Sequence, residues 1–116
     1  MSADCIFCKI IAKEIPAEIV YANEYVTAFR DIQPAAPIHI LIVPNKHIPS
    51  MNEATEDDAP LIGQMHLAAQ QIAVQEGITK SGYRLVINTG NDGGQVVYHI
   101  HLHLMGGKKL STPKYL

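Results

Sequence analysis

Three histidines alternate with apolar residues near the C-terminal end of the chain, in the segment His99-Ile-His-Leu-His103. Successive side chains of a β-strand point to opposite faces of the sheet. A strand over residues 98–105 would therefore place all three imidazoles on one face and the intervening isoleucine and leucines on the other. The pattern predicts a strand that packs on a core with one face and presents a row of imidazoles on the opposite face.

A solvent-facing strand needs polar residues too, but Thr, Lys or Glu would serve there without three groups that titrate near neutral pH. Two functional interpretations are therefore favoured. A His-x-His pair on a strand can hold a catalytic zinc ion. Alternatively, one imidazole can act as a nucleophile toward phosphorus while its neighbours donate protons and stabilise charge. The preceding loop, Gly90-Asn-Asp-Gly-Gly94, favours phosphorus chemistry because its backbone N–H groups can converge on a phosphate.

The remaining periodicities predict an α+β fold. We expect an antiparallel sheet of about five strands, packed by one long helix and a short N-terminal helix. The short helix covers residues 5–13, and the long helix follows Thr55-Glu-Asp-Asp58, which resembles a capping box, and ends at Gly77. The expected strands cover residues 18–21, 25–30, 38–43, 83–88 and 98–105.

Length and composition predict one domain over residues 1–116, with a short tail from about residue 108 to 116. The net charge is −2, and Lys108-Lys109 is the only adjacent basic pair, which argues against a nucleic-acid partner. The apolar run Ile40-Leu-Ile-Val43 is too short to span a bilayer, and the N-terminus has no secretory pattern. We therefore expect a cytoplasmic protein that binds neither nucleic acid nor membrane.

The two cysteines, Cys5 and Cys8, form a Cys-x-x-Cys pair. In a reducing compartment such a pair is more often a metal half-site or a redox motif than a structural disulfide. Two small buried residues would show the same spacing. The spacing alone leaves these alternatives open.

The segment Gly93-Gly-Gln-Val-Val-Tyr-His-Ile-His-Leu-His-Leu104 resembles the signature of the histidine triad (HIT) nucleotide-binding proteins. It is most similar to their nucleoside phosphoramidase-like branch of bacterial type, with an N-terminal Cys-x-x-Cys. The likeness covers nearly the whole chain up to about Gly107. It is carried by Cys5-Ile-Phe-Cys-Lys-Ile-Ile11, Phe29-Arg-Asp-Ile32, Ala36-Pro-Ile-His39, Pro44-Asn-Lys-His47 and Val86-Ile-Asn-Thr-Gly90.

The resemblance implies a hydrolase that cleaves purine nucleoside phosphoramidates or related nucleoside monophosphate derivatives. His101 would attack the α-phosphorus and form a transient nucleotidyl-histidine, which water then cleaves. His103 would contact the phosphate, and His39 would complete the histidine cluster. The nucleotide-binding residues that the resemblance implies are Phe29, Asp31, Ile32, Asn88, Gly94, Val96, His101 and His103.

Two positions bear on the branch of the family. Val96 stands where close members commonly carry a serine whose hydroxyl helps the leaving group, so it offers only its backbone N–H. Asn88 resembles the phosphoramidase branch, because the dinucleoside polyphosphate hydrolase branch usually carries Gln there. Hydrolysis of dinucleoside polyphosphates is therefore the alternative activity within the family.

Two histidines, His47 and His99, have no role in the implied catalysis. Together with Cys5 and Cys8 they make a Cys2His2 set, which closes a tetrahedral structural zinc site and would suit so small a domain. Many bacterial HIT proteins with this N-terminal motif are similar in holding that zinc. We therefore expect a structural zinc ion and no organic cofactor, with unliganded thiols as the alternative; His66 is interpreted as a surface or packing residue.

Family members resemble one another in forming homodimers through a sheet continued across the interface, so a homodimer is expected here. In similar proteins the C-terminal tail shapes the leaving-group side of the pocket, which makes Tyr115 and Leu116 candidate substrate contacts. Two rival functions keep the same fold: a nucleotide-binding regulator with incidental hydrolysis, and a zinc-dependent interaction module in which His101 is dispensable.

Overall fold

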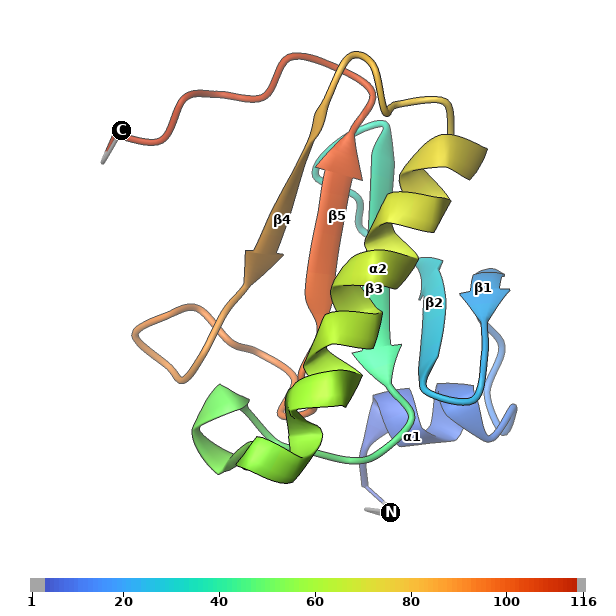
Figure 1. Cartoon of the computed structure of the whole chain (residues 1–116), viewed down its shortest axis with the longest axis vertical. Coiled ribbons are helices and arrows are strands. Elements are labelled where there is room, and N and C mark those ends of the chain that lie inside the picture. The colour runs from blue at the N-terminus through green and yellow to red at the C-terminus, as the bar shows by residue number, and fades with distance from the viewer. Residues whose placement is uncertain (1–3, 115–116) are drawn as a thin grey trace.

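A five-stranded antiparallel sheet forms the centre of the protein, as the computed structural model of residues 4–114 shows (Figure 1). The strands are β1 (Ile19–Ala22), β2 (Val26–Arg30), β3 (Ile38–Pro44), β4 (Tyr83–Ile87) and β5 (Leu102–Gly106), in the spatial order β1-β2-β3-β5-β4. The helices are α1 (Ile6–Ile11) and α2 (Ala59–Gln75), preceded by 3-10 turns at Met51–Glu53 and Glu56–Asp58. The predicted α+β fold with one long and one short helix is confirmed.

Alternation along the central strands divides the apolar residues between the two faces of the sheet. Ile40 and Ile42 of β3 join the large core beneath α2. Leu41 of the same strand points to the opposite face, where it joins a smaller core with Phe7 of α1. In the register of β3 and β5, Leu41 pairs with His103. Paired residues share a face of the sheet, so His103 lies on the α1 face.

The long helix begins and ends where the sequence predicts. The backbone N–H of Thr55 donates to the Asp58 carboxylate at 3.0 Å, which completes the predicted capping box. At the other end Gly77 adopts a φ of 72°, and the N–H of Ile78 donates to the carbonyl of Ala73 at 3.0 Å. These bonds satisfy the last turn in a Schellman motif. Between residues 4 and 114, no helix has the length and apolar character needed to cross a membrane.

The predicted strand over residues 98–105 is shorter than expected, because β5 begins only after His101. The N–H of Ile100 donates to the carbonyl of Ile48 at 2.9 Å, so it is not part of the ladder with β3. The carbonyl of His99 accepts a hydrogen bond from Nδ1 of His101 at 2.9 Å. Local hydrogen bonds therefore replace sheet pairing at the first two histidines. The other predicted elements agree with the structure to within two residues at each end.

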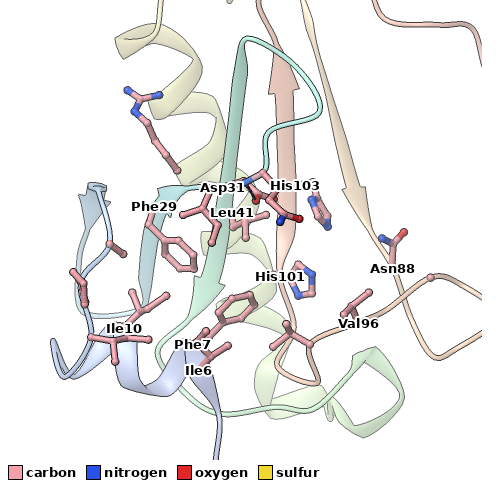
Figure 2. Close-up of a pocket in the computed structure, with 18 residues that line it drawn as sticks. Ile6, Phe7, Ile10, Phe29, Asp31, Leu41, Asn88, Val96, His101 and His103 are labelled. Atoms are coloured by element: carbon pink, nitrogen blue, oxygen red, sulfur yellow. Dashed lines mark hydrogen bonds between the residues drawn. The ribbon is translucent and has the colours of Figure 1, made fainter.

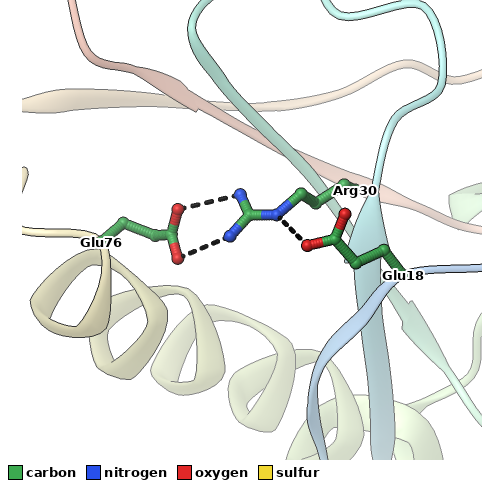
Figure 3. A network of polar contacts seen from close by, with 3 residues as sticks. All are labelled: Glu18, Arg30 and Glu76. Carbon is green, nitrogen blue, oxygen red and sulfur yellow. Dashed lines mark hydrogen bonds and ion pairs between the residues drawn. The ribbon is translucent and has the colours of Figure 1, made fainter.

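One ion-pair network ties the sheet to the C-terminal end of α2 (Figure 3). Arg30, the last residue of β2, donates two hydrogen bonds to Glu76, at 2.9 and 3.0 Å. Its Nε donates a third bond to Glu18, at 2.9 Å. The Glu76 side chain is 15% exposed and that of Glu18 is 71% exposed. The bidentate pair with Glu76 should therefore carry most of the stabilisation.

Replacing Glu76 by Gln should lower the free energy of unfolding by about 1–2 kcal/mol, because a half-buried, bidentate charged pair is weakened. The matched Glu18→Gln change should cost less than about 0.5 kcal/mol, since water screens that pair. Urea denaturation of the two variants measures the difference. Equal losses would contradict the assignment of the stabilisation to Glu76.

Candidate active site

A pocket of about 430 Å³ opens on the α1 face of the sheet (Figure 2). It lies between α1, the end of β2 and the segment that leads into β5. All eight residues predicted to bind a nucleotide line it: Phe29, Asp31, Ile32, Asn88, Gly94, Val96, His101 and His103. His39, the remaining predicted catalytic residue, does not line the pocket and lies against His103.

The apolar wall of the pocket was not predicted in full. Phe7 of α1 contacts the ring of Phe29 edge-on, with 5.4 Å between ring centroids, and both rings border the cavity. Ile6 and Ile10 of α1 and Leu41 of β3 extend this wall. The signal was available in the sequence, because the helix that carries the cysteines also carries apolar residues between and after them. An apolar, aromatic slot of this kind suits a planar base.

The middle histidine, His101, has one ring nitrogen committed and one available. Its Nδ1 lies 2.9 Å from the carbonyl oxygen of His99, which can only accept, so Nδ1 carries the proton. Nε2 is then the lone-pair nitrogen, on a side chain that lines the pocket. Burial lowers the pKa of His101, although the carbonyl of His99 and the charge of Asp31 oppose that shift. The imidazole is therefore neutral at pH 7.

A chain of hydrogen bonds assigns the protons of the other two catalytic candidates. The N–H of Ala35 donates to Nδ1 of His39 at 2.9 Å, so the proton of neutral His39 is on Nε2. That Nε2 lies 2.9 Å from Nδ1 of His103, which must accept. Nε2 of His103 therefore carries a proton, and this buried atom has no protein partner among the described residues. Burial lowers the pKa of His103 to about 4, with smaller contributions from His101 and His39.

The carboxylate of Asp31 is held at the mouth of the same pocket. One oxygen accepts the backbone N–H of Gln33 at 2.9 Å, and the other lies 3.5 Å from Nε2 of His39. The second contact agrees with a proton on that nitrogen. Asp31 is only partly buried, so it keeps acceptor capacity for hydroxyl groups of a ligand. The neighbouring Ile32 lines the pocket but is 93% exposed.

The glycine-bearing loop before the histidines is held by its own hydrogen bonds. The N–H of Gly94 donates to Asn91 at 3.0 Å, and the N–H of Gln95 donates to Gly90 at 3.0 Å. These two amides therefore do not converge on an anion, as a nest would require. The N–H of Val96, in contrast, donates to no acceptor among residues 4–114. Gly94 contributes through its backbone shape, with a φ of 87°.

A buried glutamine that the sequence analysis did not single out fixes this loop. The side-chain oxygen of Gln95 accepts the N–H of Gly90 at 3.0 Å, and its amide donates to the carbonyls of Pro49 and Val97 at 2.7 and 3.0 Å. A substituent on Gly93 would collide with the backbone of Thr89. No motif in the sequence marks Gln95, because its partners are all backbone atoms.

Behind the pocket, the four predicted metal ligands lie together. The ligand atoms of Cys5, Cys8, His47 and His99 are all within 4.8 Å of one another, and three of the four residues are buried. Nδ1 of His99 lies 3.2 Å from Sγ of Cys5, and Nδ1 of His47 lies 3.3 Å from Sγ of Cys8. Two thiols and two imidazoles in this arrangement are the donor set of a structural zinc site.

The protonation of His99 fits metal binding. Its Nε2 donates to the carbonyl of Pro44 at 2.8 Å, so Nδ1 is a lone pair directed at the thiols. Burial lowers the pKa of His99 to about 4, and the charge of His47 adds to this shift. The ring is therefore neutral, as a ligand must be. His66, by contrast, is exposed on α2, and its Nδ1 contacts the carbonyl of Ile62 at 3.0 Å.

Comparisons with known proteins agree with this geometry. The model of the HIT domain family matches residues 12–110. A purine nucleoside phosphoramidase from Escherichia coli strain K12 is 54% identical over 110 residues, which are 95% of this chain and 92% of that protein. An uncharacterized HIT-like protein from Synechococcus elongatus is 53% identical over 97% of this chain and 98% of its own length.

Solved structures show the same fold. A HIT family hydrolase from Legionella pneumophila superposes with a TM-score of 0.93 at 48% identity, over 95% of this chain and 98% of that one. A histidine triad protein from Clostridium difficile superposes with a TM-score of 0.96 at 41% identity, over 98% and 99% of the two chains.

The hydrogen-bond chain predicts one tautomer for each of three histidines. At pH 7, nitrogen-15 correlation spectra should place the proton on Nε2 of His39 and His103 and on Nδ1 of His101. In a His39→Phe variant, His103 loses the donor that fixes its tautomer and should become a mixture, while His101 should keep its proton on Nδ1. A proton on Nδ1 of His103 in the unmodified protein would refute the relay.

Proposed function

The chain belongs to the HIT domain family, and on this basis we propose that it is a hydrolase that cleaves purine nucleoside phosphoramidates through a nucleotidyl-histidine. The observation that carries the proposal is His101, a buried and neutral imidazole whose Nδ1 is bonded and whose Nε2 remains for the pocket. Such a group is a nucleophile at neutral pH without prior loss of a proton.

The first step joins His101 to phosphorus. Nε2 attacks the α-phosphorus, the P–N bond to the leaving amine breaks, and the amine takes up a proton. The imidazole then carries a positive charge, which the carbonyl of His99 stabilises by accepting Nδ1–H. In the second step water attacks the same phosphorus and releases a nucleoside monophosphate, which restores neutral His101.

Two donors suit the negative charge that builds up on the phosphate oxygens. The proton on Nε2 of His103 is buried and without a protein acceptor among the described residues, so a phosphate oxygen would satisfy it. The backbone N–H of Val96 lies on the loop across the pocket. In this proposal His39 acts as a positioning residue, because it touches His103 and not the pocket.

The opposite end of the pocket suits a nucleoside. The carboxylate of Asp31 can accept hydrogen bonds from the two ribose hydroxyls, and the base would lie in the slot between Phe7 and Phe29. Asn88 lines the phosphate side near His101. The Val96 side chain is 85% exposed and has no hydroxyl, so protonation of the leaving amine would rely on water.

An assay with adenosine 5′-phosphoramidate separates this proposal from its rivals. A His101→Ala variant should lose at least about 1000-fold in turnover, because no other group in the pocket can form the covalent intermediate. Its affinity for AMP should change by less than about threefold. His66→Ala, an exposed substitution of the same type, should behave as the unmodified protein.

Each rival function gives a different result in that assay. Equal turnover by His101→Ala and the unmodified protein would refute the nucleophile. Slow turnover by the unmodified protein with tight AMP binding would favour a nucleotide-binding regulator. Faster cleavage of a dinucleoside polyphosphate than of the phosphoramidate would favour the other branch of the family.

We also propose that the Cys2His2 cluster holds a structural zinc ion. The support is the donor set, the distances among Cys5, Cys8, His47 and His99, and the lone pair directed inward at Nδ1 of His99. The ion would link α1 to the segment after β3 and to the residue two positions before the nucleophile. It takes no part in the reaction.

Native mass spectrometry should find one zinc ion for each chain. A Cys8→Ser or a His47→Ala variant should retain less than about a tenth of this zinc at the same free metal concentration, because each removes one of four ligands. His66→Ala should retain the full amount. Retention of zinc by the two ligand variants would exclude this cluster as the site.

The predicted homodimer and cytoplasmic location belong to the same proposal. Both rest on the resemblance and on composition. Strand β4 lies at one edge of the sheet, where a second copy could continue it. Leu67 and Val74, seven residues apart on α2, are 56% and 66% exposed and would gain from burial against a partner. The predicted contacts of Tyr115 and Leu116 lie outside the described residues.

A further inference from the structure

Helix α1 belongs to the metal cluster and to the nucleotide pocket at once. Cys5 caps the helix and Cys8 lies within it, whereas Phe7, between them, lines the pocket. We propose that the metal ion in this cluster controls the affinity of the pocket for a nucleoside monophosphate, through the position of Phe7 and of the carbonyl of His99. This inference rests on the proposed function only for the identity of the pocket's ligand.

The first connection is the wall of the pocket. Helix α1 has only six residues, too few for a stable helix in isolation, so its position depends on its contacts. The ring of Phe7 lies edge-on to three other rings, with centroids 5.4 Å from Phe29, 5.9 Å from His99 and 5.2 Å from His101. Figure 2 shows Phe7 between the apolar side of the pocket and His101.

The second connection is a single residue that serves both sites. The side chain of His99 faces the cluster, with Nδ1 3.2 Å from Sγ of Cys5 and 3.2 Å from Nδ1 of His47. Its backbone carbonyl accepts Nδ1–H of His101 at 2.9 Å. A displacement of the His99 ring would therefore move the acceptor that orients the nucleophile.

The cluster holds these parts far more firmly with a metal ion than without one. Four bonds of about 2.0–2.3 Å from one ion fix all four side chains relative to one another. Without the ion, only contacts of 3.2 to 3.6 Å among thiols and imidazoles join α1 to His47 and His99. Thiols are weak hydrogen-bonding partners, so α1 gains freedom and the wall of the pocket is less well ordered.

The experiment compares AMP binding to zinc-loaded, chelator-treated and zinc-restored protein by calorimetry. We expect the dissociation constant for AMP to rise at least tenfold when zinc is removed and to return when zinc is added back. Circular dichroism of each sample checks that the metal-free chain remains folded. An unchanged dissociation constant in folded, metal-free protein would overturn the proposal.

Reciprocity supplies a second measurement that needs only loaded, folded protein. If zinc strengthens AMP binding, AMP must strengthen zinc binding by the same factor. Saturating AMP should therefore raise the chelator concentration that removes half of the zinc at least tenfold. No effect of AMP on zinc removal would also overturn the proposal, whether or not the metal-free chain folds.

Variants on α1 test the route. Phe7→Leu keeps an apolar side chain but loses the ring contacts, and it should reduce the effect of AMP on zinc removal to less than about threefold. Ile11→Ala changes a half-buried residue of the same helix that does not line the pocket, and should leave the effect unchanged. An equal loss in both variants would refute Phe7 as the connection.

The outcomes separate this inference from the proposed function. Failure of AMP to bind zinc-loaded protein would contradict the nucleotide site itself. Equal binding with and without zinc would contradict only the coupling.

Discussion

The register between β3 and β5 decides where every important side chain of this protein lies. Leu41 faces His103 across that pair of strands, and Ile42 faces Leu102. Because side chains alternate, this register directs the isoleucines and leucines beneath α2 and the histidines toward α1. A slip by one residue would bury imidazoles in the large core and expose its apolar residues to solvent. The cost of that exchange holds the site in place.

Burial on the α1 face then determines the chemistry of the imidazoles. Water is excluded from His99, His101 and His103, so their pKa values fall and all three are neutral at pH 7. A neutral ring has one donor and one acceptor nitrogen, and backbone groups select which is which. The carbonyl of His99 and the N–H of Ala35 thereby give the two catalytic candidates opposite tautomers.

Much of this arrangement follows from local pattern. Alternation placed the histidines on one face, the capping residues located α2, and residue types alone grouped the four metal ligands. The early end of the ladder at His101 could not be predicted, because it depends on hydrogen bonds to Ile48 and to the chain itself. Phe7 and Gln95 were missed for a related reason: their partners are distant in sequence, and the partners of Gln95 are backbone atoms that no residue pattern records.

The two faces of the sheet divide stability from specificity. The larger core lies beneath α2, while the pocket, the cluster of cysteines and histidines and the short helix occupy the other side. Substitutions that reshape the pocket wall therefore leave the main core intact. Such a layout gives a lineage room to change its substrate by drift on one side of the sheet, since a lost contact there does not threaten folding of the whole chain.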